Sequence, residues 1–169
     1  ISDRVVTVTL SPDDPHRAET TRVLRRSTAE NIPPEALSQP RPLQWAAPDG
    51  TTVHGLYYPP TGTASGLPPA IINIHGGPTS QARAGYNPRA QFFATRGYAY
   101  LEVNYRGSTG YGKAYMAALH GKWGVLDVED AVGGARHLVD GGLADGDRLV
   151  IMGGSAGGHT VLKALVDHP

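Results

Sequence analysis

The sequence predicts an α/β fold in which a mostly parallel sheet carries helices on both faces. From Ala70 onward, short apolar runs alternate with helix-periodic segments, and this order is typical of parallel strands joined by right-handed crossovers. The run AIINIH at 70–75 is almost continuously apolar, as a strand covered on both faces would be. Eleven of the fourteen prolines lie at or before Pro69, so the remaining hundred residues can hold uninterrupted elements.

Three strands and three helices are expected in this second part. The strands are at 70–75, 98–105 and 147–152, and the helices are at 86–96, 126–140 and 156–166. Pro88 is expected to break the first helix early. The second helix begins with Asp127, Glu129 and Asp130, which its dipole favours, and ends at a glycine pair. Its apolar face is expected to hold Val128, Val132, Ala135 and Val139, with Ala131 and Leu138 beside it.

The first part of the chain has shorter elements. Arg4–Leu10 and Thr20–Arg26 are predicted strands separated by a turn, and two strands alone cannot bury a core. Residues 29–42 hold four prolines and are interpreted as a stiff linker. Leu43–Tyr58 is predicted to be a hairpin that turns at Pro48–Gly50.

Composition excludes several functions. Fifteen basic residues balance fifteen acidic ones, without a basic patch, so a nucleic-acid partner is not expected. The absence of cysteine excludes disulfides, thiolate catalysis and cysteine-ligated zinc. No apolar run approaches the roughly 18–20 residues that span a membrane. The beginning at Ile1 does not resemble a signal peptide, and we expect a cytoplasmic location, no membrane association, no cofactor and no metal.

The stretch Gly153-Gly154-Ser155-Ala156-Gly157 fits the pattern G-x-S-x-G between a predicted strand and a predicted helix. This context is typical of a nucleophile held on a tight turn, with Gly153 and Gly157 allowing strand and helix to approach. The N–H of Ala156 would be one donor to an oxyanion. The alternative is a turn that merely connects two elements or binds phosphate, although the glycine spacing does not fit a dinucleotide-binding loop.

A second glycine turn, INIHGGP at 72–78, follows the strand at 70–75. In α/β-hydrolases the other oxyanion donor lies at this place, and Gly77 is the candidate, with Gly76 keeping the loop open. His75 is expected to shape this loop. The alternative is an ordinary strand-to-loop turn.

A third stretch, GSTGYGKA at 107–114, almost fits a phosphate-binding loop. Ala114 stands where the magnesium-binding hydroxyl is required, and the next helix is expected only near Leu126. Nucleotide binding is therefore not expected.

Together, HGGP, NYRGSTGYG, WGVLDVEDAV and GGSAGGHTVL occur in an order and spacing that resemble the prolyl oligopeptidase family of serine peptidases. The likeness covers roughly residues 33–169 and is greatest to the acylaminoacyl-peptidase and dipeptidyl-aminopeptidase-like members. It implies that residues 1–28 are the remnant of a β-propeller, that 29–42 are the linker, and that 43–169 are an incomplete α/β-hydrolase domain. His75 and His159 depart from branches of the family that have tyrosine there.

By the same resemblance Ser155 matches the nucleophile, and Gly77 and Ala156 match the oxyanion donors. In this fold the acid and the base follow the serine. Of the histidines that do so, His159 lies within the helix that the serine opens, and His168 lies at its far end, about 20 Å away. Neither is expected to be the base, so the triad Asp and His are expected to be missing from the chain. The resemblance implies that they belong to a further segment of the same domain.

The expected parent function is hydrolysis of short peptides through an acyl-enzyme, and this chain alone is expected to be inactive. A carboxylesterase or lipase is the alternative enzyme, and a non-catalytic scaffold is the alternative of another class. A peptide substrate is the expected partner. The open sheet would leave apolar area exposed, which favours a homo-oligomer.

Overall fold

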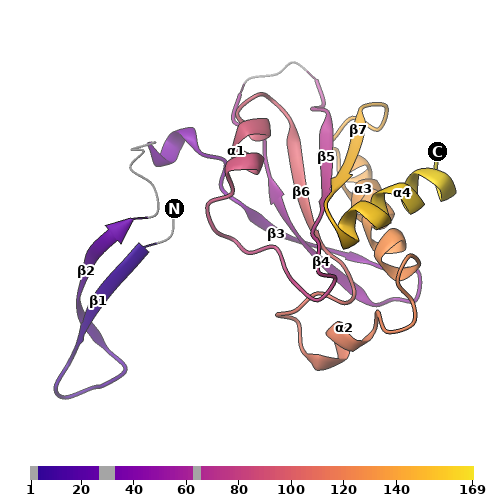
Figure 1. Cartoon of the computed structure of the whole chain (residues 1–169). Coiled ribbons are helices and arrows are strands. Elements are labelled where there is room, and N and C mark those ends of the chain that lie inside the picture. The colour runs from indigo at the N-terminus through magenta and orange to yellow at the C-terminus, as the bar shows by residue number, and fades with distance from the viewer. Residues whose placement is uncertain (1–3, 27–32, 63–65) are drawn as a thin grey trace.

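The computed structural model describes residues 4–26, 33–62 and 66–169 (Figure 1). Its strands are β1 (Arg4–Leu10), β2 (Ala18–Arg26), β3 (Arg41–Ala46), β4 (Thr52–Tyr58), β5 (Ala70–Ile74), β6 (Ala99–Asn104) and β7 (Leu149–Gly153). Its helices are α1 (Pro88–Ala94), α2 (Lys113–Ala117), α3 (Leu126–Asp140) and α4 (Ala156–Asp167), and a 3₁₀ turn covers Pro34–Ala36.

Five strands form one mixed sheet in the order β3-β4-β6-β5-β7. The parallel strands predicted from the sequence are its β6-β5-β7 part, where Ile74 pairs with both Val103 and Gly153. The predicted hairpin β3–β4 joins this part through an antiparallel pairing of β4 with β6. The carboxyl ends of β5, β6 and β7 therefore lie at one edge of the sheet, which is where ligands bind in α/β folds.

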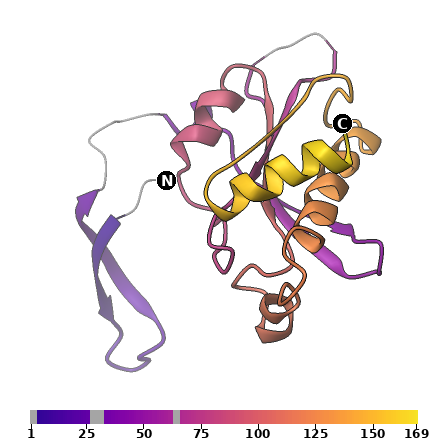
Figure 2. The same cartoon turned by 45° about the vertical axis from the view of Figure 1, so that its right-hand side comes forward.

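Helices cover both faces of the sheet, as the sequence predicts. Ile72, Leu101 and Val103 belong to a core shared with α3, whereas Ile71 and Tyr100 belong to a second core shared with α1. Successive strand residues point to opposite faces, so the apolar runs of β5 and β6 supply both cores. Figure 2 shows α3 and α4 side by side, and the two helices are in contact.

The buried face of α3 is centred on Ala131, Gly134 and Leu138. The sequence predicts Val128, Val132, Ala135 and Val139 on this face; Val128 is buried as expected, and the other three are only half-buried. The reason is Trp45 of β3, whose indole lies so close to the helix that a Cβ on Gly134 would be 2.9 Å from the ring. A glycine on this face is invisible to a search for apolar periodicity, yet it is the residue that lets the largest side chain approach.

Pro88 begins α1 rather than breaking it, so the predicted helix 86–96 is wrong at its start. Proline at the first position of a helix loses no hydrogen bond. The Asn87 side chain caps the helix by accepting from the N–H groups of Arg89 and Ala90. Its amide nitrogen donates to the buried Glu102 at 2.7 Å. Burial raises the pKa of this carboxyl, although its hydrogen bonds act in the opposite direction.

The segment predicted as a linker is tied to the domain at Ser38. The Ser38 N–H donates to Gln91 Oε1 of α1, and Gln91 Nε2 donates back to the Ser38 carbonyl, both at 2.8 Å. Ser38 is buried, and β3 starts at Arg41 rather than at 43. The proline-rich segment thus joins the packed structure several residues before the predicted hairpin begins.

The strands β1 and β2 form a separate two-stranded sheet (Figure 1). Their apolar side chains stay exposed, including Val5, Val8, Leu10 and Leu24. This agrees with the expectation that two strands alone cannot bury a core.

Candidate active site

Ser155 lies at the junction between β7 and α4 in a conformation that serine rarely adopts. Its φ is 54° and its ψ is −122°, and it is the one non-glycine residue with positive φ in the described parts of the chain. Such a backbone costs about 1–3 kcal/mol and persists only where the surroundings enforce it. The residue is exposed at the carboxyl edge of the sheet. This is the geometry of a nucleophile turn.

The glycines on either side of Ser155 are required by close backbone approach. A Cβ on Gly153 would lie 2.6 Å from the Gly157 carbonyl oxygen, and a Cβ on Gly157 would overlap the Ile74 carbonyl oxygen at the end of β5. Since these are backbone atoms, no side chain can move away to make room. Strand β5, strand β7 and helix α4 therefore meet at these two glycines.

The loop after β5 packs directly on the turn at Ser155. A Cβ on Gly76 would lie 3.0 Å from the Gly154 carbonyl oxygen and 3.3 Å from Ser155 Cβ. Gly77 has a φ of 135°, which favours glycine, and a Cβ there would lie 2.9 Å from the Thr79 nitrogen. The two glycine turns identified in the sequence thus form one site.

The N–H groups of Ala156 and Gly77, which the sequence predicts to be oxyanion donors, belong to the two glycine turns that meet at Ser155. The Ala156 N–H belongs to the first turn of α4, whose donors have no partner within the helix. The carbonyl of Gly76 accepts a hydrogen bond from His75 Nδ1 at 2.8 Å. In a trans peptide the C=O and N–H point in opposite directions, so this bond also fixes the direction of the Gly77 N–H.

His75 is held by the loop that follows β6. Its ring stacks on Tyr105 with 4.4 Å between centroids, and its Nε2 lies 2.8 Å from Ser108 Oγ. The Gly76 carbonyl only accepts, so Nδ1 carries a proton. Burial lowers the pKa of His75, although its hydrogen bond to the Gly76 carbonyl acts in the opposite direction. The Ser108 hydroxyl donates to the Tyr105 carbonyl at 2.7 Å. The Tyr105 hydroxyl lies 3.2 Å from the His75 and Pro78 carbonyls, to which it donates.

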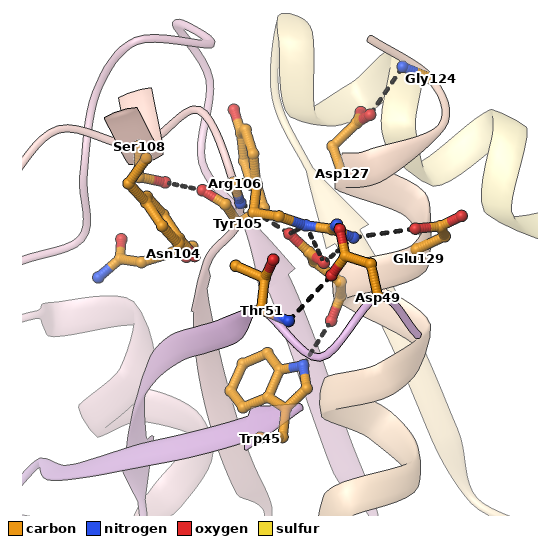
Figure 3. Close-up of polar contacts among 12 residues, drawn as sticks. Trp45, Asp49, Thr51, Asn104, Tyr105, Arg106, Ser108, Gly124, Asp127 and Glu129 are labelled. Atoms are coloured by element: carbon orange, nitrogen blue, oxygen red, sulfur yellow. Dashed lines mark hydrogen bonds and ion pairs between the residues drawn. The ribbon is translucent and has the colours of Figure 1, made fainter. Parts of the chain in front are cut away.

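Arg106, which follows Tyr105 in the chain, anchors the loop after β6 to α3 (Figure 3). Its guanidinium donates to both carboxylate oxygens of Asp130, and its backbone N–H donates to Asp130 as well. The same guanidinium pairs with Asp49 at 2.8 Å and Glu129 at 2.9 Å. Arg106 is 1% exposed and Asp130 is fully buried, so this ion pair is part of the core. The sequence suggested only a dipole role for the acidic residues of α3.

Asp127 forms a third link around the site. One carboxylate oxygen accepts the Gly124 N–H at 2.7 Å, as Figure 3 shows, and the other accepts the hydroxyl of Thr160 on α4. Both Asp127 and Thr160 are fully buried. The helix that carries Ser155 at its start is therefore fixed to α3 and to the loop before it.

The structure brings together the six residues singled out in the sequence, Gly76, Gly77, Gly153, Ser155, Ala156 and Gly157. Their catalytic roles remain predictions. The sequence did not point to four further residues that support the site, namely Tyr105, Ser108, Asp127 and Thr160. The available signal was their place: Tyr105 and Ser108 follow β6, whose end lies beside the end of β5.

The two downstream histidines do not face Ser155. The ring of His159 lies against Trp123, with 4.8 Å between centroids. His168 follows α4 and lines a hollow with Arg136 and Asp140, about one helix length from the serine.

The sequence predicts no helix between the stretch at 107–114 and Leu126. This expectation is wrong, because helix α2 begins at Lys113. Helix α2 has five residues and no buried side chain.

The described residues hold neither a metal-binding cluster nor a membrane-spanning helix. Within 4–26, 33–62 and 66–169 no group of three His, Asp or Glu side chains is arranged to hold a metal ion. Over the same ranges no helix combines the length and the hydropathy needed to cross a bilayer.

Comparison with known proteins gives one consistent family. Residues 84–169 match the model of the prolyl oligopeptidase family. The chain belongs to this family, and its five-stranded sheet with the turn at Ser155 is part of an α/β-hydrolase fold.

Individual relatives agree with this assignment. The chain is 39% identical over 108 residues to dipeptidyl aminopeptidase BIII of Pseudoxanthomonas mexicana, covering 64% of this chain and 16% of that protein. It is 39% identical over 90 residues to the acylamino-acid-releasing enzyme of Arabidopsis thaliana, covering 53% of this chain and 12% of that protein. A puromycin-hydrolyzing peptidase of Mycobacterium tuberculosis superposes with a TM-score of 0.82 and 45% identity, covering 86% and 23% of the two chains. The chain thus spans less than a quarter of the length of each of these three relatives.

Proposed function

We propose that this chain carries the nucleophile and the oxyanion site of a serine peptidase that hydrolyses short peptides through an acyl-enzyme. The observation that supports it most is the backbone of Ser155, whose φ of 54° places an exposed hydroxyl between β7 and α4. A conformation of this cost is expected at a functional site. The peptidase names of the matched relatives support the reaction class.

In the proposed mechanism Ser155 Oγ attacks the scissile carbonyl and its proton passes to a base. The carbonyl oxygen becomes an oxyanion that accepts from the N–H groups of Ala156 and Gly77. The positive end of the α4 dipole faces the same place. The C–N bond then breaks, the amine leaves with a proton, and water releases the acyl group from Ser155.

We place the acid and the base outside this chain. His159 lies against Trp123, and His168 is at the other end of α4. The share of each relative that the chain covers supports the same interpretation. Without the base, a serine on an oxyanion site keeps only a small part of its rate, so the 169 residues alone are expected to show negligible turnover.

The domain assignment is part of this proposal. Residues 1–28 would be the end of a β-propeller, 29–42 the linker and 43–169 the incomplete hydrolase domain. The exposed hairpin β1–β2 supports it, since its apolar side chains need partners from elsewhere. Self-association and a cytoplasmic location stay predictions.

The test is hydrolysis of peptide nitroanilides and of acyl esters by the full-length protein and by its Ser155→Ala variant. We expect turnover of the peptides that falls at least about a thousandfold in the variant. Turnover of esters alone would favour the carboxylesterase alternative. Equal turnover by both proteins would contradict the assignment of Ser155.

A further inference from the structure

The loop after β6 (residues 105–112) is hydrogen-bonded to the loop after β5 (residues 75–87), which carries the proposed oxyanion donor Gly77. The loop after β6 holds most of the stretch GSTGYGKA, which resembles a phosphate-binding loop without fitting one. Its Thr109 N–H donates to the Ser80 carbonyl at 2.8 Å. The two loops therefore lie together at the carboxyl edge of the sheet.

A glycine of this stretch is explained by the contact between the two loops. Gly110 has a φ of 91°, and a Cβ there would overlap the side-chain amide of Gln81 in the loop after β5. The backbone conformation and the neighbouring side chain both favour glycine at this position. Contact between two loops of the chain itself thus accounts for a glycine that the sequence alone leaves without a role.

Asn104, the last residue of β6, makes the most complete link between the loops. Its Oδ1 accepts the Ala82 N–H at 2.7 Å, and its Nδ2 donates to the Ala82 carbonyl at 3.1 Å. The same Nδ2 donates to the Tyr111 hydroxyl at 2.8 Å. Both donors and the acceptor of this amide are therefore in use. One side chain ties Ala82 in the loop after β5 to Tyr111 in the loop after β6.

Burial makes this link rigid. Asn104 is fully buried, and a buried amide that loses its partners cannot replace them with water. Its backbone carbonyl is also bonded, since it accepts the Tyr115 hydroxyl at 2.7 Å. Further segments that pack on this chain would add cover to Asn104 rather than remove it. The side chain is thus held in one orientation by four hydrogen bonds to the residue.

The loop after β5 needs such support at its start. Gly76 lies so close to the serine turn that a Cβ on it would be 3.3 Å from Ser155 Cβ. Gly76 and Gly77 have no side chains that could anchor this part of the backbone, and glycine has the most conformational freedom to lose. The position of the Gly77 N–H therefore depends on bonds made by the residues that follow it, at the Pro78 carbonyl and at Ala82.

We propose that Asn104 is a positioning residue for the oxyanion site, because it holds Ala82 and thereby the backbone that carries the Gly77 N–H. This inference rests on the proposed function, since it assumes that Gly77 donates to an oxyanion formed by attack of Ser155. Asn104 touches no substrate in this role. An oxyanion exists only in the transition state and the intermediate, so a misplaced donor slows the chemical step without weakening substrate binding.

The test compares Asn104→Ala with Gln91→Ala in the full-length protein. Gln91 is the matched control, because its buried amide accepts the Ser38 N–H and donates to the Ser38 carbonyl, both at 2.8 Å. Ser38 bonds to Pro59, which follows β4 beside the amino end of β6 and so lies away from Asn104. Each variant deprives one backbone N–H and one backbone carbonyl of their partner.

Hydrolysis of a slow peptide nitroanilide, for which KM reports binding, gives the result. We expect Asn104→Ala to lower kcat about tenfold to a hundredfold and to change KM by less than about threefold. Gln91→Ala should lose comparable stability in urea and keep its kcat. Unchanged kcat in Asn104→Ala, or an equal loss in Gln91→Ala, would overturn the role of Asn104.

Tyr111→Phe is a milder variant that keeps the test decisive if Asn104→Ala does not fold. It removes one partner of Asn104 and leaves both bonds to Ala82, so kcat should fall only about threefold, again with little change in KM. Circular dichroism of each variant shows whether it folds. If Asn104→Ala is unfolded, an unchanged kcat in Tyr111→Phe overturns the proposal.

Fluorophosphonate labelling of the unsubstituted protein separates failure of this inference from failure of the proposed function. Labelling at Ser155 together with turnover of the peptide supports the proposed function, and the kcat values of the variants then decide the role of Asn104. If Ser155 is not labelled, the proposed function is wrong, and the inference that rests on it is overturned as well.

Discussion

Replacing Gly157 by alanine tests whether the packing of three elements holds Ser155 in place. The added Cβ would overlap the Ile74 carbonyl oxygen and lie 2.8 Å from the His75 carbonyl oxygen. Real Cβ contacts essentially never fall under 3.0 Å. Both atoms belong to the backbone at the end of β5, so the helix must move away from the strand. Ser155, at the start of that helix, moves with it.

The magnitude follows from two opposing effects. Forcing an extra carbon into a packed site costs about 1–3 kcal/mol, and contact with backbone favours the upper end. Alanine gains about 0.5–1 kcal/mol over glycine in a helix. We therefore expect Gly157→Ala to lower the free energy of unfolding by about 2 kcal/mol. Gly158→Ala is the control, because its nearest neighbour is the Gly153 carbonyl oxygen at an ordinary 3.6 Å. It should be neutral or slightly stabilising.

Urea unfolding of the full-length variants gives the stability difference, and the rate of fluorophosphonate labelling gives the state of Ser155. We expect Gly157→Ala to lose both stability and labelling and Gly158→Ala to keep both. Equal stability and equal labelling of the two variants would refute the claim that β5, β7 and α4 converge at Gly157.

Three further outcomes are expected. Arg106→Leu leaves the Asp130 carboxylate buried without its partner, and it should lower the free energy of unfolding in urea by about 3–5 kcal/mol. Adding Asp130→Asn should restore part of this loss. Full stability of the single variant would contradict the contribution of the ion pair. Asn87→Asp keeps the cap of α1 but puts a carboxylate against Glu102, so it should destabilise at neutral pH and less so in acid, where the pair binds a proton. Because burial lowers the pKa of His75 in the folded state, the unfolded state binds the proton first, and stability should fall as pH drops below about 6.5. The stability of His75→Gln, followed by thermal unfolding over the same pH range, should fall less steeply with decreasing pH. If stability depends on pH equally in both proteins, His75 does not contribute to the loss.

Much of the fold could be predicted because its signals are local. The strand at 70–74 is a continuous apolar run, and the helix at 126–140 begins with acidic residues and ends at glycines. The turn at Ser155 is visible because small residues flank it between two regular elements. These features depend on neighbours in the chain, so a single sequence contains them.

The parts that escaped prediction depend on contacts distant in sequence. Arg106 pairs with Asp49 across 57 positions and with Asp130 across 24, and nothing in the NYRG stretch points to either partner. Trp45 moves the buried face of α3 because it fits against Gly134. Helix α2 buries no side chain, so it has no apolar periodicity to reveal it. In each case the tertiary partner, rather than local propensity, decides the outcome.

The central claim is that Ser155 is a nucleophile. Its most direct test is mass-spectrometric mapping of the full-length protein after reaction with a fluorophosphonate, beside the Ser155→Ala variant. We predict one adduct, located on the peptide that contains Ser155 and absent from the variant. An adduct on another residue, or the same adduct yield in the variant, would contradict the claim.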